Sequence, residues 1–271
     1  MKIKKAIIAT SHRDSHGEIL HPNGLKLMVE EINKNYLRVG VEHDPRIPPI
    51  GRIVRAELII MEDGEYAVQA DIEIFEVGDK YSLDKNSKEM VIHKNEKDKL
   101  FIIYDRSFRD PNKLKIVNEI ADEFKTKPIE EVKKAADPLS ILIIAGGFIL
   151  SSIAAGFFGK LGSDIYDSLI KKLKLLYKKG NANTDHERLL IFEFTVYSDA
   201  SFINVSVIIT NPDEKVIELF LREGIFKLDE FLLHYYNIDM GLSEIYFEYN
   251  VNELKVIYGI RKDVVPIYPQ K

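Results

Sequence analysis

The sequence predicts an α+β protein with a small N-terminal β-barrel carrying helices, a central apolar helix of membrane length and a C-terminal antiparallel ββααββ domain. Two observations support this prediction. Apolar and polar residues alternate in both halves of the chain, and an uncharged run at residues 138–159 separates the halves. The expected domains are residues 1–125, a linker with an apolar and a basic helix at 126–180, and residues 185–271.

Composition excludes several kinds of site. The chain has 271 residues, 45% of them hydrophobic, which is enough for two hydrophobic cores. The formal net charge of -5 gives no reason to expect a nucleic-acid partner. The absence of cysteine excludes disulfides and thiolate chemistry and suits a reducing compartment. The N-terminus has too short an apolar run for a secretory signal, so residues 2–10 are predicted to form a strand.

The first half reads as a strand, a loop, a helix, a strand and a hairpin. Apolar residues at helical spacing predict a helix over residues 25–35, after a Pro-Asn-Gly start signal. Alternation predicts strands at 52–60 and 66–75, joined by a turn with an Asp-Gly signal. This order indicates a small barrel or sandwich with one helix packed on it.

A loop after the first strand holds three histidines, together with Asp14 and Glu18. The histidines are His12, His16 and His21. Imidazole and carboxylate groups bind zinc, but the spacing does not match the helical HExxH pattern. We therefore expect no metal here, and the sequence points to no cofactor.

Residues 1–115 also contain an ordered series of short motifs. In chain order these are Asp14-x-x-Gly17-Glu18-Ile19-Leu20-His21-Pro22, a helix, Glu42-His43-Asp44, Pro49-Ile50-Gly51 and Asp63-Gly64-Glu65-Tyr66-Ala67-Val68. This series resembles the start of the phage prohead (capsid-maturation) serine proteases, whose fold is similar to that of the herpesvirus assemblins. The resemblance says nothing about the remainder of the chain.

The resemblance implies a serine endopeptidase with a protein or peptide substrate. Ser107 would be the nucleophile, with Pro111 at the expected place after it, and His43 would be the general base. The third member would follow the serine, and the sequence does not separate the four candidates Asp110, Glu119, Asp122 and Glu123.

Two alternatives to this pair stay open. The charged segment at residues 78–99 is expected to loop out, and it contains Ser82, Ser87 and His93 as rival residues. Alternatively, the fold is present without catalysis. In that case His43 is a hydrogen-bonded loop histidine and Ser107 an ordinary strand-end serine.

The middle of the chain is predicted to be helical. Residues 113–124 and 128–132 read as helices, and the run at 138–159 is long enough to cross a hydrocarbon core of roughly 30 Å. Within it, Gly147, Ser151, Ala155 and Gly159 recur at every fourth position. This spacing favours close helix association, either in a membrane or in the buried seam of a homo-oligomer.

Residues 162–179 are predicted to form a basic amphipathic helix. Ile165, Leu169, Leu173 and Leu176 share one stripe, and lysines occupy the other faces. Such a helix lies along an anionic membrane, or it packs on a core with a solvated lysine face. Next to the apolar run, the pattern favours a membrane-associated protein at the cytoplasmic face, with shallow insertion as an alternative.

The C-terminal half shows strands at 189–197, 202–210, 244–250 and 254–261, with two helices at 211–222 and 228–236. It contains no nucleophile–base pair, phosphate loop or metal spacing, which favours a binding or assembly module. Two functional hypotheses follow. One is a membrane-associated, prohead-protease-like serine peptidase. The other is a non-enzymatic membrane effector or oligomeric scaffold built around the Gly/Ala/Ser-rich helix.

Overall fold

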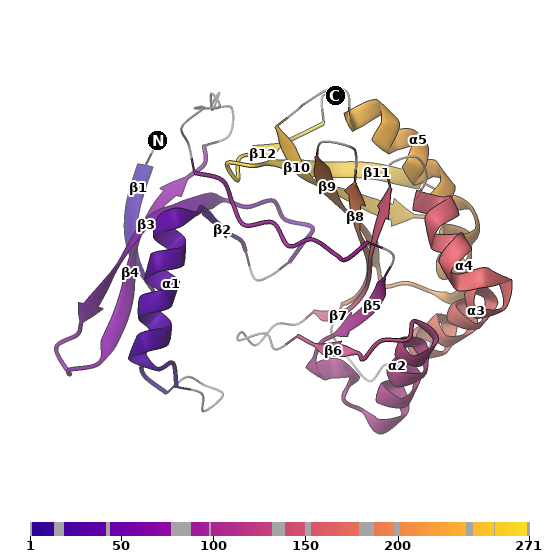
Figure 1. The fold of residues 1–271 in the computed structure, drawn as a ribbon, viewed down its shortest axis with the longest axis horizontal. Coiled ribbons are helices and arrows are strands. Elements are labelled where there is room, and N and C mark those ends of the chain that lie inside the picture. Colours follow the sequence, from indigo (N-terminus) through magenta and orange to yellow (C-terminus); the bar gives the residue numbers. More distant parts are fainter. Residues whose placement is uncertain are drawn as a thin grey trace. The chain divides into compact units, whose positions relative to one another are not determined.

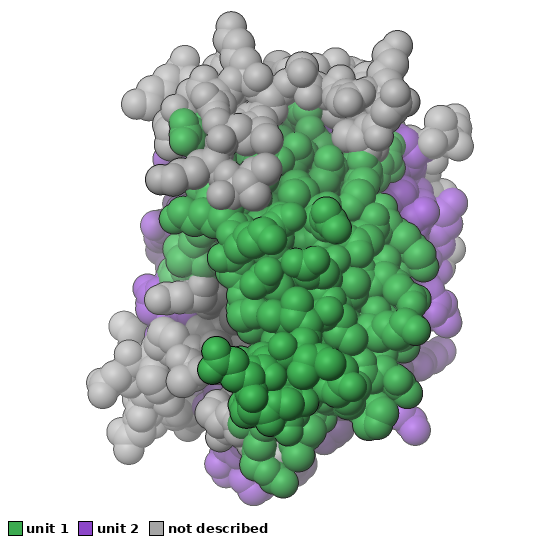
Figure 2. Space-filling view, turned by 90° about the vertical axis from the view of Figure 1, so that its left-hand side faces the viewer, with its two compact units in different colours: residues 1–92, 260–267 green, residues 93–259, 268–271 purple. Residues whose placement is uncertain are grey.

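The computed structural model describes residues 2–13, 19–41, 44–76, 88–97, 99–131, 139–149, 153–178, 187–197, 201–236, 241–251 and 253–269. The chain forms two compact units (Figure 2). Unit 1 comprises residues 1–92 and 260–267, and unit 2 comprises residues 93–259 and 268–271. The expected boundary at residue 125 therefore lies within the sequence of unit 2, and a short C-terminal segment returns to unit 1.

Unit 1 is an open four-stranded sheet with one helix. The strands follow the spatial order β1 (Lys2–Thr10), β4 (Tyr66–Ile74), β3 (Gly51–Ile60) and β2 (Leu37–Val39), and neighbouring strands are antiparallel. Helix α1 (Pro22–Lys34) packs on the sheet through buried Leu25 and Ile32 (Figure 1). The predicted closed barrel is wrong, because β1 and β2 are the two ends of this sheet. A helix on one face buries its apolar side without closure.

A buried ion cluster attaches the C-terminal segment to unit 1. Arg52 Nε donates to Glu73 Oε2 at 2.8 Å, and Arg52 Nη1 donates to the carbonyl oxygen of Asp263 at 2.7 Å. The guanidinium also lies 4.2 Å from the centre of the Tyr36 ring. A second arginine, Arg261, places Nη2 2.7 Å from Asp263 Oδ2. Both carboxylate side chains are only 4% exposed, so each depends on its arginine partner.

An eight-stranded sheet has the order β12-β11-β10-β9-β8-β7-β5-β6, and all its strands except β12 and the end of β11 belong to unit 2. The pairs β5/β6, β7/β8 and β9/β10 are parallel, whereas β5/β7 and β8/β9 are antiparallel. The strands are β5 (Leu100–Tyr104), β6 (Ile129–Glu130), β7 (Ser140–Ile149), β8 (Arg188–Tyr197), β9 (Phe202–Thr210), β10 (Leu242–Asn250), β11 (Glu253–Arg261) and β12 (Pro266–Ile267).

The predicted antiparallel C-terminal domain is therefore wrong in topology. Helix α4 (Glu214–Leu219), a π-helical turn (Phe220–Gly224) and α5 (Ile225–Tyr236) carry the chain from β9 to β10, so these strands lie parallel. The same sheet continues through β7 into β5. A predicted short helix at 128–132 is also wrong, since its start forms the edge strand β6.

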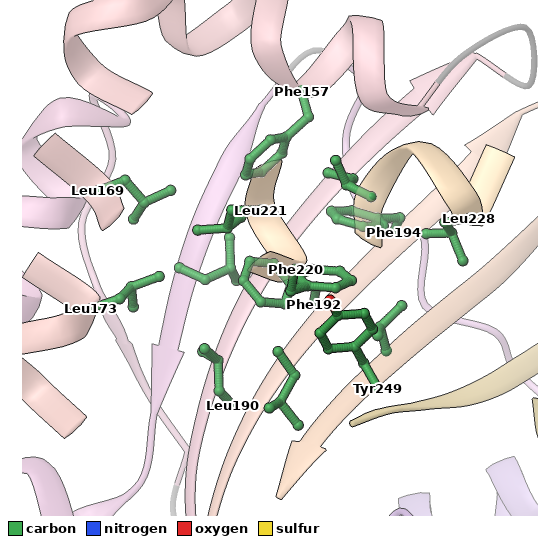
Figure 3. Packing of buried hydrophobic residues seen from close by; sticks show 14 of the residues in the cluster. Phe157, Leu169, Leu173, Leu190, Phe192, Phe194, Phe220, Leu221, Leu228 and Tyr249 are labelled. Atoms are coloured by element: carbon green, nitrogen blue, oxygen red, sulfur yellow. The ribbon is translucent and has the colours of Figure 1, made fainter. Parts of the chain in front are cut away.

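All helices described in unit 2 cover one face of this sheet (Figure 1). They include α2 (Pro111–Glu123) and α3 (Ile153–Tyr177). Aromatic rings from helices and strands interlock in the core (Figure 3). The ring centres of Phe192 and Phe220 lie 4.7 Å apart, and those of Phe157 and Phe194 lie 6.0 Å apart. Burial of this layer is the main favourable contribution to the stability of unit 2.

The apolar run at 138–159 is not one helix. Its first part is β7, and its last part begins α3. No helix in the described residues is long and apolar enough to span a membrane. The predicted transmembrane helix is wrong, and so is the membrane-associated cytoplasmic localisation predicted from it. The physical reason is that β7 lies between two neighbouring strands and is buried on both faces, and such strands are apolar throughout.

Two small residues of this run, Gly147 and Gly156, make close contacts on two different elements, whereas a Cβ added at Gly159 meets nothing within 4 Å. A Cβ added at Gly147, in β7, would lie 2.6 Å from the carbonyl oxygen of Glu96. A Cβ added at Gly156, in α3, would lie 2.7 Å from the ring of Phe148. The described small residues of the run thus belong to a strand and to a helix, so they do not form a single stripe on one helix.

Helix α3 packs on the core with its apolar stripe. Leu169 and Leu173 are fully buried, and Lys172 Nζ lies 2.6 Å from Glu123 Oε1. The first turn of the helix is capped by Asp229, which accepts a hydrogen bond from the backbone nitrogen of Ile153 at 2.8 Å. The apolar stripe therefore packs on the core, as the second of the two interpretations expected, but Lys172 is ion-paired and only 17% exposed.

Candidate functional site

Ser107 lies in a one-turn 3-10 helix (Arg106–Phe108) directly after β5. Asp105 Oδ1 accepts hydrogen bonds from the backbone nitrogen of Ser107 at 2.8 Å and from its Oγ at 2.5 Å. The other oxygen of Asp105 accepts from the backbone nitrogen of Ile141 at 2.5 Å. Asp105 is only 6% exposed. The carboxylate therefore fixes the turn and joins the end of β5 to β7.

The expected base, His43, lies outside the described residues, and it belongs to the sequence of unit 1 whereas Ser107 belongs to unit 2. The residue after it, Asp44, forms a bidentate pair with Arg46, with Nη2 donating to Oδ2 at 2.7 Å and Nε to Oδ1 at 2.9 Å. The Ser107–His43 pair stays a prediction. What the structure does show is that the Ser107 hydroxyl donates to a carboxylate.

Of the four candidate third members, Asp110 and Glu123 accept hydrogen bonds through their carboxylates. Asp110 caps α2 by accepting from the backbone nitrogens of Asn112 at 3.0 Å and Lys113 at 3.2 Å. Glu123 accepts from Ser168 Oγ at 2.6 Å and also pairs with α3, as described above. The other two, Glu119 and Asp122, lie on the same helix. The rivals Ser82 and Ser87 lie outside the described residues.

The histidines of the first loop have local roles where they are described. His12 Nε2 lies 2.7 Å from Asp63 Oδ2, and this hydrogen bond holds the pKa of Asp63 below its ordinary value. His21 Nδ1 accepts from the backbone nitrogen of Asn23 at 3.2 Å and so caps α1. His16 lies outside the described residues, as do Asp14 and Glu18. Within the part of the chain that is described, no three His, Asp or Glu side chains form a metal-binding group.

The second face of the unit 2 sheet carries a group of polar side chains, which we call the polar face. On β8, Phe192 and Phe194 point to the helices, so Glu193 and Thr195 point to the other side. Thr195 is fully buried. A buried hydroxyl needs a hydrogen-bond partner. The polar face comprises Gly147 of β7, Glu193, Thr195 and Tyr197 of β8, Phe202, Asn204 and Ser206 of β9, and Glu244 and Tyr246 of β10.

Strand register places these residues in three rows, of which the first joins Tyr197 and Phe202. Thr195 pairs with Asn204, which in turn pairs with Glu244 on β10. In the next row Ser206 lies between Glu193 and Tyr246. Two hydrogen bonds link members within the face: Thr195 Oγ1 donates to Asn204 Oδ1 at 2.8 Å, and Tyr246 Oη donates to Glu244 Oε2 at 2.6 Å.

An extended segment at residues 93–97, which we call the connector, lies on the polar face. Thr195 Oγ1 accepts from the backbone nitrogen of Asn95 at 2.9 Å. Asn204 Nδ2 donates to the carbonyl oxygen of His93 at 2.8 Å, and Tyr197 Oη donates to that of Asn95 at 2.6 Å. All three bonds join a side chain of the sheet to the main chain of the connector. The polar face therefore holds an extended polypeptide by its peptide groups.

Close contact and charge complete this attachment. The carbonyl oxygens of the connector approach Gly147 so closely that no other residue fits there without a shift. Lys94 Nζ lies 4.2 Å from the centre of the Phe202 ring, and Lys97 Nζ lies 4.7 Å from that of Tyr197. Burial raises the pKa of Tyr197, and the Glu96 carboxylate raises it further.

This site is not among those predicted from the sequence, although the sequence contains part of its signal. Polar residues at alternate positions in two successive apolar strands, Glu193 and Thr195 in one and Asn204 and Ser206 in the other, mark a polar sheet face. The connector gives no such signal, because it lies in the charged segment that was expected to loop out.

Comparisons with protein-family models, with curated proteins and with solved structures find no significant match to this chain. The resemblance to the prohead proteases therefore stays a prediction from short motifs.

Proposed function

We propose that this chain is a non-enzymatic binding protein that holds an extended polypeptide on the polar face of unit 2. One observation carries the proposal: three side chains of the polar face bond to main-chain groups of the connector. Main-chain groups are the same in every polypeptide, so a surface that bonds to them accepts an extended segment from another protein as well.

The geometry around Ser107 supports a non-enzymatic role. A nucleophilic serine needs a base positioned to take its proton, with a third group orienting that base. Here the hydroxyl donates to Asp105, which also accepts from two backbone nitrogens. This arrangement is typical of a capped turn. The proposal retains the non-enzymatic hypothesis of a binding or assembly protein and omits the membrane association that accompanied it.

The test is binding of a peptide to a chain whose own connector is weakened. Asn95→Pro removes the N–H from which Thr195 Oγ1 accepts, so the connector loses one of the three bonds that side chains of the polar face make to its main chain. The probe is a fluorescein-labelled peptide with the sequence of residues 91–97. We expect the full-length variant to bind it at least about tenfold more tightly than the unmodified chain, because a tethered connector competes at roughly millimolar effective concentration.

The matched control is Asn95→Pro combined with Thr195→Val, which keeps the shape of the buried side chain but removes its hydroxyl. We expect this double variant to lose most of the gained affinity. Amide exchange in β8 is measured for each variant, and slow exchange there would show that the variant keeps its sheet. Absence of peptide binding to a folded Asn95→Pro variant would contradict the proposed function.

A further inference from the structure

We infer that the partner segment is basic, with two lysines three positions apart, and that the connector occupies the same site as an internal competitor. This inference rests on the proposed function, because it names the chemistry of the polypeptide that the polar face binds.

The connector itself provides the pattern. Its two lysines each place an ammonium group over an aromatic ring, at 4.2 Å for Lys94 on Phe202 and 4.7 Å for Lys97 on Tyr197. The two rings belong to cross-strand partners, and their centres lie 6.3 Å apart. Two adjacent rings therefore form a pair of cation sites beside the main-chain bonds.

The charge of the polar face favours the same partner. Glu193 and Glu244 both belong to this face, and Glu244 is only 7% exposed. The chain as a whole carries a formal net charge of -5. Carboxylates beside a binding surface attract a basic segment and disfavour an acidic one, so they add selectivity to main-chain recognition.

Because the connector is part of the chain, it competes with the partner for the polar face and lowers the partner's apparent affinity. A partner binds only the fraction of molecules whose connector has left the polar face. If that fraction is about 1%, the apparent dissociation constant is about 100-fold weaker than the intrinsic one. A change that releases the connector would therefore increase partner binding without altering the polar face.

The experiment compares two peptides on the full-length Asn95→Pro variant. One has the sequence of residues 91–97, and the other replaces the residues that correspond to Lys94 and Lys97 by glutamine. We expect the glutamine peptide to bind about tenfold more weakly, since each exposed cation–π contact contributes roughly a threefold change in affinity. Adding Phe202→Leu to the variant should weaken the lysine peptide and leave the glutamine peptide nearly unchanged.

The outcomes separate this inference from the proposed function. Equal affinities for the two peptides overturn the inference of a basic partner and leave the proposed function standing. Failure of both peptides to bind a folded variant overturns the proposed function and the inference with it. Loss of both peptides equally in the Phe202→Leu variant also overturns the inference, because the ring would then act by packing alone.

Discussion

Replacing Asp105 by alanine is expected to lower the free energy of unfolding by about 3 kcal/mol. The carboxylate is buried and accepts hydrogen bonds from two backbone nitrogens and one hydroxyl. Its removal leaves the N–H of Ile141 without this acceptor at a buried strand position, and releases the turn that contains Ser107. Urea denaturation followed by circular dichroism measures the loss.

Ser107→Ala is the matched control, because it removes one hydrogen bond at an exposed position. We expect it to cost about 1 kcal/mol or less. Equal costs for the two substitutions would contradict the view that Asp105, not Ser107, organises this turn. A cost below about 1 kcal/mol for Asp105→Ala would contradict it as well.

Arg52→Met is expected to lower the free energy of unfolding by about 4 kcal/mol, the usual cost of leaving buried charges without a partner. Arg52 bonds to Glu73 and to the carbonyl oxygen of Asp263, and it lies against the Tyr36 ring. The loss should also weaken the attachment of residues 260–267 to unit 1. Amide exchange at Met90, whose nitrogen donates to the carbonyl oxygen of Lys262 at 2.8 Å, reports on that attachment.

The control is the double variant Arg52→Met with Glu73→Gln, in which the buried carboxylate is replaced by a neutral amide. It should be more stable than the sum of the two single effects predicts, because the uncompensated charge is gone. Strict additivity, or unchanged exchange at Met90 in the Arg52→Met variant, would show that the cluster does not hold this segment.

Local sequence signals predicted many elements well. The bounds of β1 and β9 are those expected, and α2 (Pro111–Glu123) begins two residues before and ends one residue before the helix expected at 113–124. These elements depend on alternation, caps and prolines within a few residues. The contacts that determine these elements are close in the chain, so the sequence alone predicts them.

The errors arise where the determining contacts are distant. A strand buried between two neighbouring strands and a membrane helix are both uncharged and apolar. The hydrophobic periodicity of residues 138–159 therefore does not distinguish these two structures. The parallel pairing of β9 and β10 depends on how the intervening helices pack. The two attachments that matter most here join Asn95 to Thr195 and Arg52 to Asp263, positions that no local pattern connects.

The most direct test of the account is the amide exchange rate of Asn95 in the unmodified chain and in Thr195→Val. If the polar face holds the connector by its main chain, this amide is protected, and the substitution accelerates its exchange at least about tenfold while the core amides of β8 stay slow. An Asn95 amide that exchanges freely in the unmodified chain, or one that Thr195→Val leaves unchanged, would contradict the account.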